Sequence, residues 1–180
     1  FFQFAVTPWG EISGKIVFNS NRIAGERGSI NMVYQDGKNE PIFKDRALYK
    51  YKWSPGGTKI VAFAGYQSLF IDTEGKVLQS INRPAGIIGQ DLAWFPDNKK
   101  ALAIEYDGGK GFRKGFEPTH LFIYDFSTGE RIPFYGKADY IFFDLTISEG
   151  GRIVFAGRRS GKEYLDEPFS LYEIDPKIKE

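Results

Sequence analysis

The sequence contains no cysteine and a single histidine among its 180 residues. Without thiols the chain can form neither a disulfide scaffold nor a thiolate zinc site, and one imidazole cannot build a histidine-rich metal centre. Long apolar segments are also missing, because the longest uninterrupted run, Ile60–Ala64, is far shorter than the about 20 residues of a membrane-spanning helix. We therefore expect no metal, no cofactor and no transmembrane segment.

An excess of charge of either sign is absent too. The 24 Lys and Arg residues nearly balance 23 Asp and Glu, which leaves a formal net charge of +1. Proteins that bind nucleic acid or anionic membranes through electrostatics carry clustered positive charge. The balance therefore argues against a nucleic-acid partner and against a polybasic membrane tether.

Aromatic residues and turn-forming residues are abundant. Aromatics make up 17% of the chain, and 21 Gly and 9 Pro are spread along it. This combination is typical of many short strands joined by turns, and the apolar content opposes disorder. We therefore expect an all-β protein, and no segment shows the period of an amphipathic helix.

One strand–turn–strand unit recurs four times. The copies are Trp53–Phe63, Trp94–Ile104, Ile147–Phe155 and a weaker one at Ile12–Phe18. Each is followed by a second hairpin, in which an apolar strand ends near an Asp that we interpret as a turn-former rather than a calcium ligand: Asp36, Asp72, Asp125 and Asp175.

The spacing of the copies indicates the architecture. The basic residue after the first turn is Lys15, Lys59, Lys100 or Arg152, so the copies lie 44, 41 and 52 residues apart. Periods of about 40–45 residues with four strands per unit are typical of propeller blades. The long third period contains a glycine-rich insert at 107–118.

The repeat sequences resemble the WD40-like (PD40) repeats of the TolB β-propeller family. The segments that carry this resemblance are W-S-P-G-G-T-K-I-V-A-F, W-F-P-D-N-K-K-A-L-A-I and I-S-E-G-G-R-I-V-F-A-G. The resemblance implies a propeller that binds another protein or a peptide, and a location in the bacterial periplasm or cell envelope. That family has six blades, whereas this chain has material for about four.

We expect a single β-propeller domain over 1–180, with blades at 8–44, 45–82, 83–134 and 135–180. Residues 1–7 are expected to supply the missing fourth strand of the last blade, so that a monomer closes on itself. The alternatives are a piece of a larger propeller and a half-ring that pairs with another chain. Because the chain opens with Phe1 rather than Met, we also expect a processed product or a fragment.

Long connections gather on one face of the predicted propeller, where binding residues usually lie. The candidates on this face are Phe112, Arg113, Lys114, Phe116, Arg158 and Arg159. Aromatic and Arg side chains often anchor protein interfaces. The alternatives are that the two Phe fold back over a blade edge, and that Glu163, Asp166 and Glu167 neutralise the two Arg.

Catalytic patterns are not apparent. No serine lies in a G-x-S-x-G elbow, and His120 has no identifiable partner. Asp91 and Asp144, expected at the start of innermost strands, are candidates to line a central channel that holds water, a cation or a basic peptide. The leading hypothesis is a non-enzymatic scaffold that binds a protein or peptide. The alternatives are a regulatory propeller of a prolyl-oligopeptidase-like or tricorn-like peptidase, and a carbohydrate-binding propeller.

Overall fold

The computed structural model describes residues 4–5, 16–20, 29–33, 39–44, 48–108, 119–135, 140–159 and 167–174. These residues form fifteen strands and no helix. The all-β class is therefore confirmed for the described part of the chain, and no helix there is long and apolar enough to cross a membrane.

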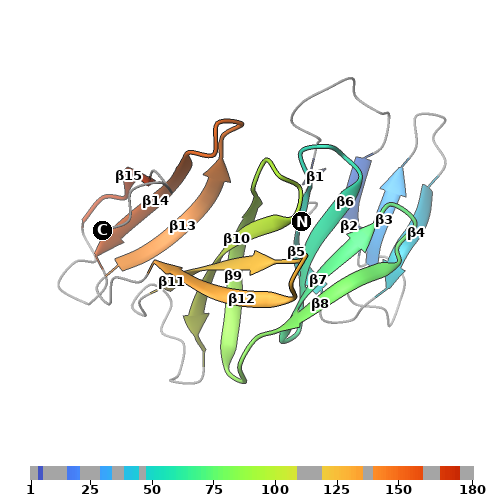
Figure 1. Cartoon of the computed structure of the whole chain (residues 1–180), viewed down its shortest axis with the longest axis horizontal. Coiled ribbons are helices and arrows are strands. Elements are labelled where there is room, and N and C mark those ends of the chain that lie inside the picture. Colours follow the sequence, from blue (N-terminus) through green and yellow to red (C-terminus); the bar gives the residue numbers. More distant parts are fainter. Residues whose placement is uncertain are drawn as a thin grey trace. The chain divides into compact units, whose positions relative to one another are not determined.

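The strands form four sheets, in each of which neighbours along the chain pair antiparallel (Figure 1). The first contains β1 (Phe4–Ala5), β2 (Ile16–Ser20), β3 (Ser29–Val33) and β4 (Asn39–Lys44). The second contains β5 (Leu48–Trp53), β6 (Lys59–Ala64), β7 (Gln67–Asp72) and β8 (Val77–Asn82). The third contains β9 (Ile87–Trp94), β10 (Lys100–Asp107), β11 (Thr119–Asp125) and β12 (Glu130–Tyr135). The fourth contains β13 (Tyr140–Ile147), β14 (Ile153–Arg159) and β15 (Ser170–Ile174).

The predicted hairpins occur where the repeat placed them. Trp53 pairs with Ile60, Trp94 with Ala101, and Ile147 with Ile153 across the first turn of the three later units. Trp53 and Trp94 end β5 and β9, the first strand of each sheet, and both are only 5% exposed. The sequence repeat therefore corresponds to one sheet per unit.

Carboxylates organise the predicted turns. Asp72 Oδ1 accepts the backbone N–H groups of Glu74 (3.0 Å) and Lys76 (2.8 Å). Asp125 Oδ1 accepts the N–H groups of Ser127 (2.9 Å) and Thr128 (3.3 Å). The turn-forming role predicted for these two residues is confirmed, whereas Asp36 and Asp175 lie outside the described residues.

The second and third sheets bury both of their faces. Every residue from Ile60 to Ala64 in β6 and from Ala101 to Glu105 in β10 is buried, although successive side chains point to opposite faces. A sheet with two apolar faces needs cover on both sides, which is the physical reason for repeating it.

The chain divides into two compact units, residues 1–82 and 83–180, each with two sheets. In the second unit one continuous apolar core joins the third and fourth sheets. It contains Ala93, Leu102, Ile104 and Leu121 from the third sheet and Phe142, Leu145, Ile153 and Phe155 from the fourth. The prediction of one closed domain of four blades stays a prediction.

The prediction for the N-terminal strand was wrong. Phe4 pairs with Phe18 and Ala5 with Val17, so β1 is the first strand of the first sheet and not the fourth strand of the last one. The short distance along the chain favours this pairing, because closing a small loop costs less entropy than closing one of nearly the whole chain. Among the described residues the fourth sheet has three strands.

Candidate functional site

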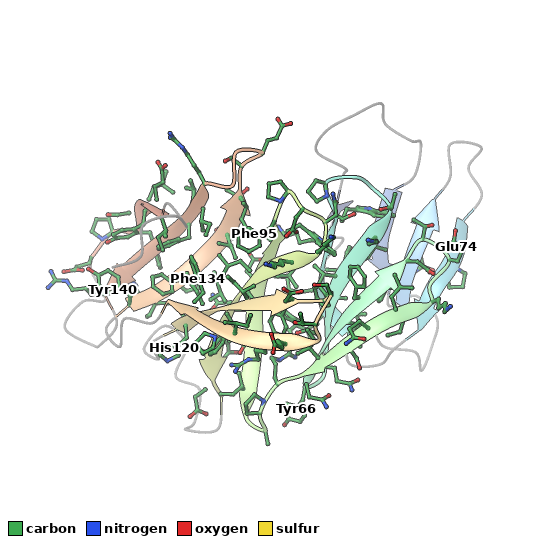
Figure 2. All side chains as sticks on the ribbon, viewed as in Figure 1. Tyr66, Glu74, Phe95, His120, Phe134 and Tyr140 are labelled. Carbon is green, nitrogen blue, oxygen red and sulfur yellow. The ribbon has the colours of Figure 1, made fainter. Side chains whose placement is uncertain are left out.

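Connections of different length lie at the two ends of the sheets. At one end, the turn end, the connections 34–38, 54–58, 73–76, 95–99, 126–129 and 148–152 have four or five residues each, and the connection 6–15 of the first sheet has ten. The opposite end, the loop end, carries the connections 21–28, 65–66, 108–118 and 160–169 within sheets, and 45–47, 83–86 and 136–139 between them. In the third sheet Phe95 lies at the turn end and His120 at the loop end (Figure 2).

The longest connection, 108–118, starts from an anchored position. The Gly108 N–H donates to the Gly86 carbonyl oxygen at 2.8 Å, which ties the start of this loop to the connection that leads into β9. The predicted binding residues Phe112, Arg113, Lys114 and Phe116 follow within this connection and lie outside the described residues.

Arg158 and Arg159 lie together at the loop end of β14, and both make contacts there. The Arg158 guanidinium lies over the Phe169 ring, 4.9 Å from its centroid. Arg159 Nη2 lies 2.8 Å from Glu167 Oε1, so the predicted neutralisation of this cation by Glu167 is confirmed. Glu163 and Asp166 lie outside the described residues. The end of β14 therefore presents an ordered cation–aromatic group and a half-exposed ion pair.

The two channel candidates differ in their surroundings, and both lie inside strands rather than at their starts. Asp91 is 4% exposed, and its Oδ2 accepts the Leu145 N–H of β13 at 2.9 Å. Asp144 is exposed and has a positive φ of 44°, where β13 carries a bulge. The bulge takes the neighbouring Leu145 amide out of the regular ladder, and the Asp91 carboxylate accepts it.

A second polar side chain bonds the same two sheets. Thr119 is 2% exposed, and its Oγ1 accepts the Phe142 N–H at 2.6 Å. Thr119 and Asp91 of the third sheet thus both bond to backbone amides of β13. Sequence reasoning missed this role, because it depends on which strands face each other across the core.

A buried polar group on the opposite face of the third sheet was also missed. Glu105 is 1% exposed and accepts hydrogen bonds from the Tyr124 hydroxyl and from Arg131, whose Nε and Nη2 lie 3.1 and 2.5 Å from Oε2. The Arg131 guanidinium lies 3.3 Å from the centroid of the Phe122 ring. The sequence contained one signal for this group, because Glu105 directly follows the apolar run Ala101–Ile104. Its partners could be identified only from the strand register.

The carboxylate of Glu105 is therefore bonded on both oxygens to residues of its own sheet. His120 lies directly across from it in the ladder and is half-buried. No group of three acidic or histidine side chains suited to hold a metal ion occurs among the residues that the structure describes. The described residues at the loop end of the fourth sheet include the Phe169 ring and the guanidinium groups of Arg158 and Arg159.

Comparison with known proteins identifies the fold. No family model and no curated protein matches the sequence. Solved structures with a similar fold include the β-propeller domain of the Trilobed protease from Pyrococcus furiosus, which is 18% identical with a TM-score of 0.67 over 98% of this chain and 54% of that one. An oligogalacturonate lyase in complex with manganese is 14% identical with a TM-score of 0.72 over 98% of this chain and 50% of that one.

TolB from Acinetobacter baumannii is 19% identical, with a TM-score of 0.63 over 90% of this chain and 38% of that one. The chain therefore has the fold of a TolB-like β-propeller, as its repeats predicted. It spans between 38% and 54% of the length of these three structures. At such low identity the likeness describes the fold alone.

Proposed function

We propose that this chain is a non-enzymatic scaffold that binds a protein or a peptide at the loop end of its sheets. The observation that carries the proposal is the difference in connection length between the two ends of the sheets. In the second, third and fourth sheets, turns of four or five residues close one end, whereas connections of up to eleven residues lie at the other. Long loops on a rigid sheet framework are where binding residues usually lie.

The chemistry at the loop end supports an interface. Arg158 stacked on Phe169 is a pre-ordered pair of the residue types that contribute most to protein interfaces. The predicted residues of the 108–118 connection add two Phe, an Arg and a Lys, and the Gly108–Gly86 hydrogen bond fixes where that connection leaves the sheet. An extended peptide offers both the backbone carbonyls and the side chains that such a surface recognises.

Selection from a displayed library of random linear peptides tests the proposal. Peptides enriched on the immobilised chain are expected to bind Phe112→Ala/Arg113→Ala and Arg158→Ala/Arg159→Ala variants at least about tenfold more weakly, the loss of one interface anchor. The matched control is Glu149→Ala/Arg152→Ala, which removes two exposed charged residues at the turn end of the fourth sheet. Equal binding by all variants, or no enrichment, would contradict the proposal. A loss of several kcal/mol in stability for the first variant would instead show that those side chains belong to the core.

A second candidate function is a regulatory propeller attached to a peptidase. The similarity to the propeller domain of the Trilobed protease favours it, and the chain spans about half of that domain's length. Sequencing the gene beyond this segment separates the two candidates. A hydrolase signature such as G-x-S-x-G downstream favours the peptidase, whereas a secretion signal upstream without such a signature favours the scaffold.

For location we propose the bacterial cell envelope, which the likeness of the repeats to TolB supports. Fractionation of the producing cells, followed by detection of the chain with an antibody, tests this. Recovery in the cytoplasmic fraction alone would contradict it.

A further inference from the structure

The second sheet differs from the others at its loop end. The connection between its second and third strands, β6 and β7, consists of Gly65 and Tyr66 alone, whereas the same connection has eight to eleven residues in the other three sheets. Gly65 has a positive φ of 53° and Tyr66 does not, which is the pattern of a type II′ hairpin turn. This turn needs glycine at its first position, but it does not require an aromatic residue at its second.

Tyr66 is an exposed aromatic residue. It is 58% exposed and lies at the opposite end of the second sheet from Glu74 (Figure 2). An aromatic ring stabilises a fold through the area that it buries, so a ring that is mostly in water contributes little. A single exposed ring is common on protein surfaces, and its neighbours therefore determine what it can bind.

A pair of side-chain amides lies next to this tyrosine. Gln67 follows Tyr66 directly, and Gln67 and Asn82 are opposite each other in the ladder of β7 and β8. Gln67 Nε2 donates to Asn82 Oδ1 at 3.0 Å, although both residues are exposed. Because water offers the same hydrogen bonds, an exposed bond of this kind adds little to stability. It does hold the two amides together, so that they present donor and acceptor groups side by side.

The amide pair continues a row of residues that crosses the whole sheet. The register joins Leu48 to Ala64, Ala64 to Gln67, and Gln67 to Asn82. Leu48 and Ala64 are both 4% exposed and belong to the apolar core of this sheet. The row therefore changes from covered apolar residues to exposed amides, and the amide half lies beside Tyr66.

The charge at this end of the sheet limits the kind of ligand. The described residues 48–49, 64–67 and 82 are all neutral, and the neighbouring Arg83 is only 3% exposed. Phosphate and carboxylate ligands are recognised through charged donors, so this surface does not suit them. An aromatic ring beside paired amides suits a neutral ligand that has an apolar face and several hydroxyl groups, because a hydroxyl both donates and accepts. A pyranose ring has this chemistry, since its C–H groups can pack on an aromatic face.

We propose that Tyr66, Gln67 and Asn82 form a binding surface for a neutral saccharide. The Tyr66 ring packs against the C–H face of one sugar unit, and the amides of Gln67 and Asn82 bond its hydroxyl groups. The surface includes none of the residues of the proposed peptide-binding site, so either proposal can fail without the other.

Titration calorimetry with four neutral hexasaccharides tests the surface: maltohexaose, cellohexaose, mannohexaose and laminarihexaose. At least one is expected to bind the wild type with a Kd below about 1 mM. Tyr66→Ala is expected to weaken this binding at least about tenfold, because it removes the stacked ring, whereas Tyr66→Phe keeps the ring and should bind within about threefold of the wild type. Gln67→Ala and Asn82→Ala each remove one amide and should each weaken binding about fivefold.

Two matched controls come from the same sheet. Leu78→Ala shortens an apolar side chain of β8 that is 41% exposed, and Thr73→Ala removes the exposed hydrogen bond from Thr73 Oγ1 to Glu74 Oε1 (2.8 Å) at the turn end. Both variants are expected to bind the saccharide as the wild type does. Circular dichroism of each variant confirms that the protein tested is folded.

Three results would overturn the proposal. The first is no binding of any of the four hexasaccharides at about 10 mM. The second is binding that Tyr66→Ala leaves unchanged or that the two controls weaken equally. The third is a Tyr66→Phe variant that binds as weakly as Tyr66→Ala, because the ring would then not be the group that contacts the sugar.

Discussion

Asp125, at the end of β11, contributes to the dependence of stability on pH. The Ser127 hydroxyl, then the backbone N–H groups of Ser127 and Thr128 and the Lys100 ammonium, hold the pKa of Asp125 below its ordinary value against the opposing effect of burial. A carboxylate with a lowered pKa stabilises the folded state above its unfolded pKa of about 3.9 and loses that contribution as the pH falls through its folded pKa.

Asp125→Asn is expected to lower the free energy of unfolding at pH 7 by about 1.5–3 kcal/mol, the usual value of hydrogen bonds to charged groups. It is also expected to reduce the loss of stability as the pH falls below the ordinary pKa of an aspartate, because the wild-type carboxylate loses its contribution as it takes up a proton. Urea unfolding at neutral pH and below that pKa measures this. Ser127→Ala removes only the hydroxyl and should give an intermediate pH dependence. An unchanged pH dependence in Asp125→Asn would show that other groups govern it.

The buried Glu105 group allows a second prediction for single residues. Glu105→Ala leaves the Arg131 guanidinium, whose side chain is 18% exposed, without its carboxylate, and the Tyr124 hydroxyl loses its acceptor. We expect a loss of about 3 kcal/mol, as for other broken buried ion pairs. The double variant Glu105→Leu/Arg131→Met should be more stable than Glu105→Ala, because no buried charge stays unpaired. Chemical denaturation of the single and double variants gives their free energies of unfolding. A double variant less stable than the single one would contradict the argument.

Among the elements, β13 is held to the third sheet by two buried side-chain acceptors, Asp91 and Thr119. Thr119→Val keeps the shape of the side chain and removes the oxygen that accepts the Phe142 N–H. An unpaired buried amide costs about 1–3 kcal/mol, so the variant should lose that much stability and the Phe142 amide should exchange faster than those of β14. Hydrogen exchange followed by NMR measures both. Thr128→Val, in an exposed turn, is the control and should change neither.

The elements were also what the sequence predicted best. Trp53, Trp94 and their turn residues mark the hairpins, since tight turns need particular residues: Gly57 and Gly75 have positive φ, and Asp72 and Asp125 bond their own turns. Local chemistry of this kind is visible in a single sequence. The pairing of β1 was not, because Phe4 and Ala5 are apolar strand residues that fit the edge of more than one sheet.

The candidate site was less predictable for the same physical reason. The lengths of the connections along the sequence predicted which end of the sheets carries the long loops. Glu167 was correctly predicted to neutralise the arginine pair, since it bonds one of the two arginines. The bonds from Asp91 to Leu145 and from Thr119 to Phe142 join residues 54 and 23 positions apart. Such contacts depend on how sheets stack, which residue spacing within one repeat does not encode.

For the molecule as a whole, the division into two compact units bears on how the chain unfolds. In the second unit both faces of the third sheet are buried, with Leu92 and Ala103 fully covered on the face opposite to the shared core. In the first unit both faces of β6 are buried. Small compact units with buried cores usually unfold cooperatively, so we expect each unit to unfold in a single transition.

The tryptophans provide the measurement, because Trp53 belongs to the first unit and Trp94 to the second, and both are buried. Variants that keep one of them, with the other and Trp9 replaced by Phe, report each unit separately by fluorescence during urea unfolding. A single sigmoidal transition is expected for each variant. A curve with two steps for either variant would contradict this and would mean that the two sheets of that unit unfold separately.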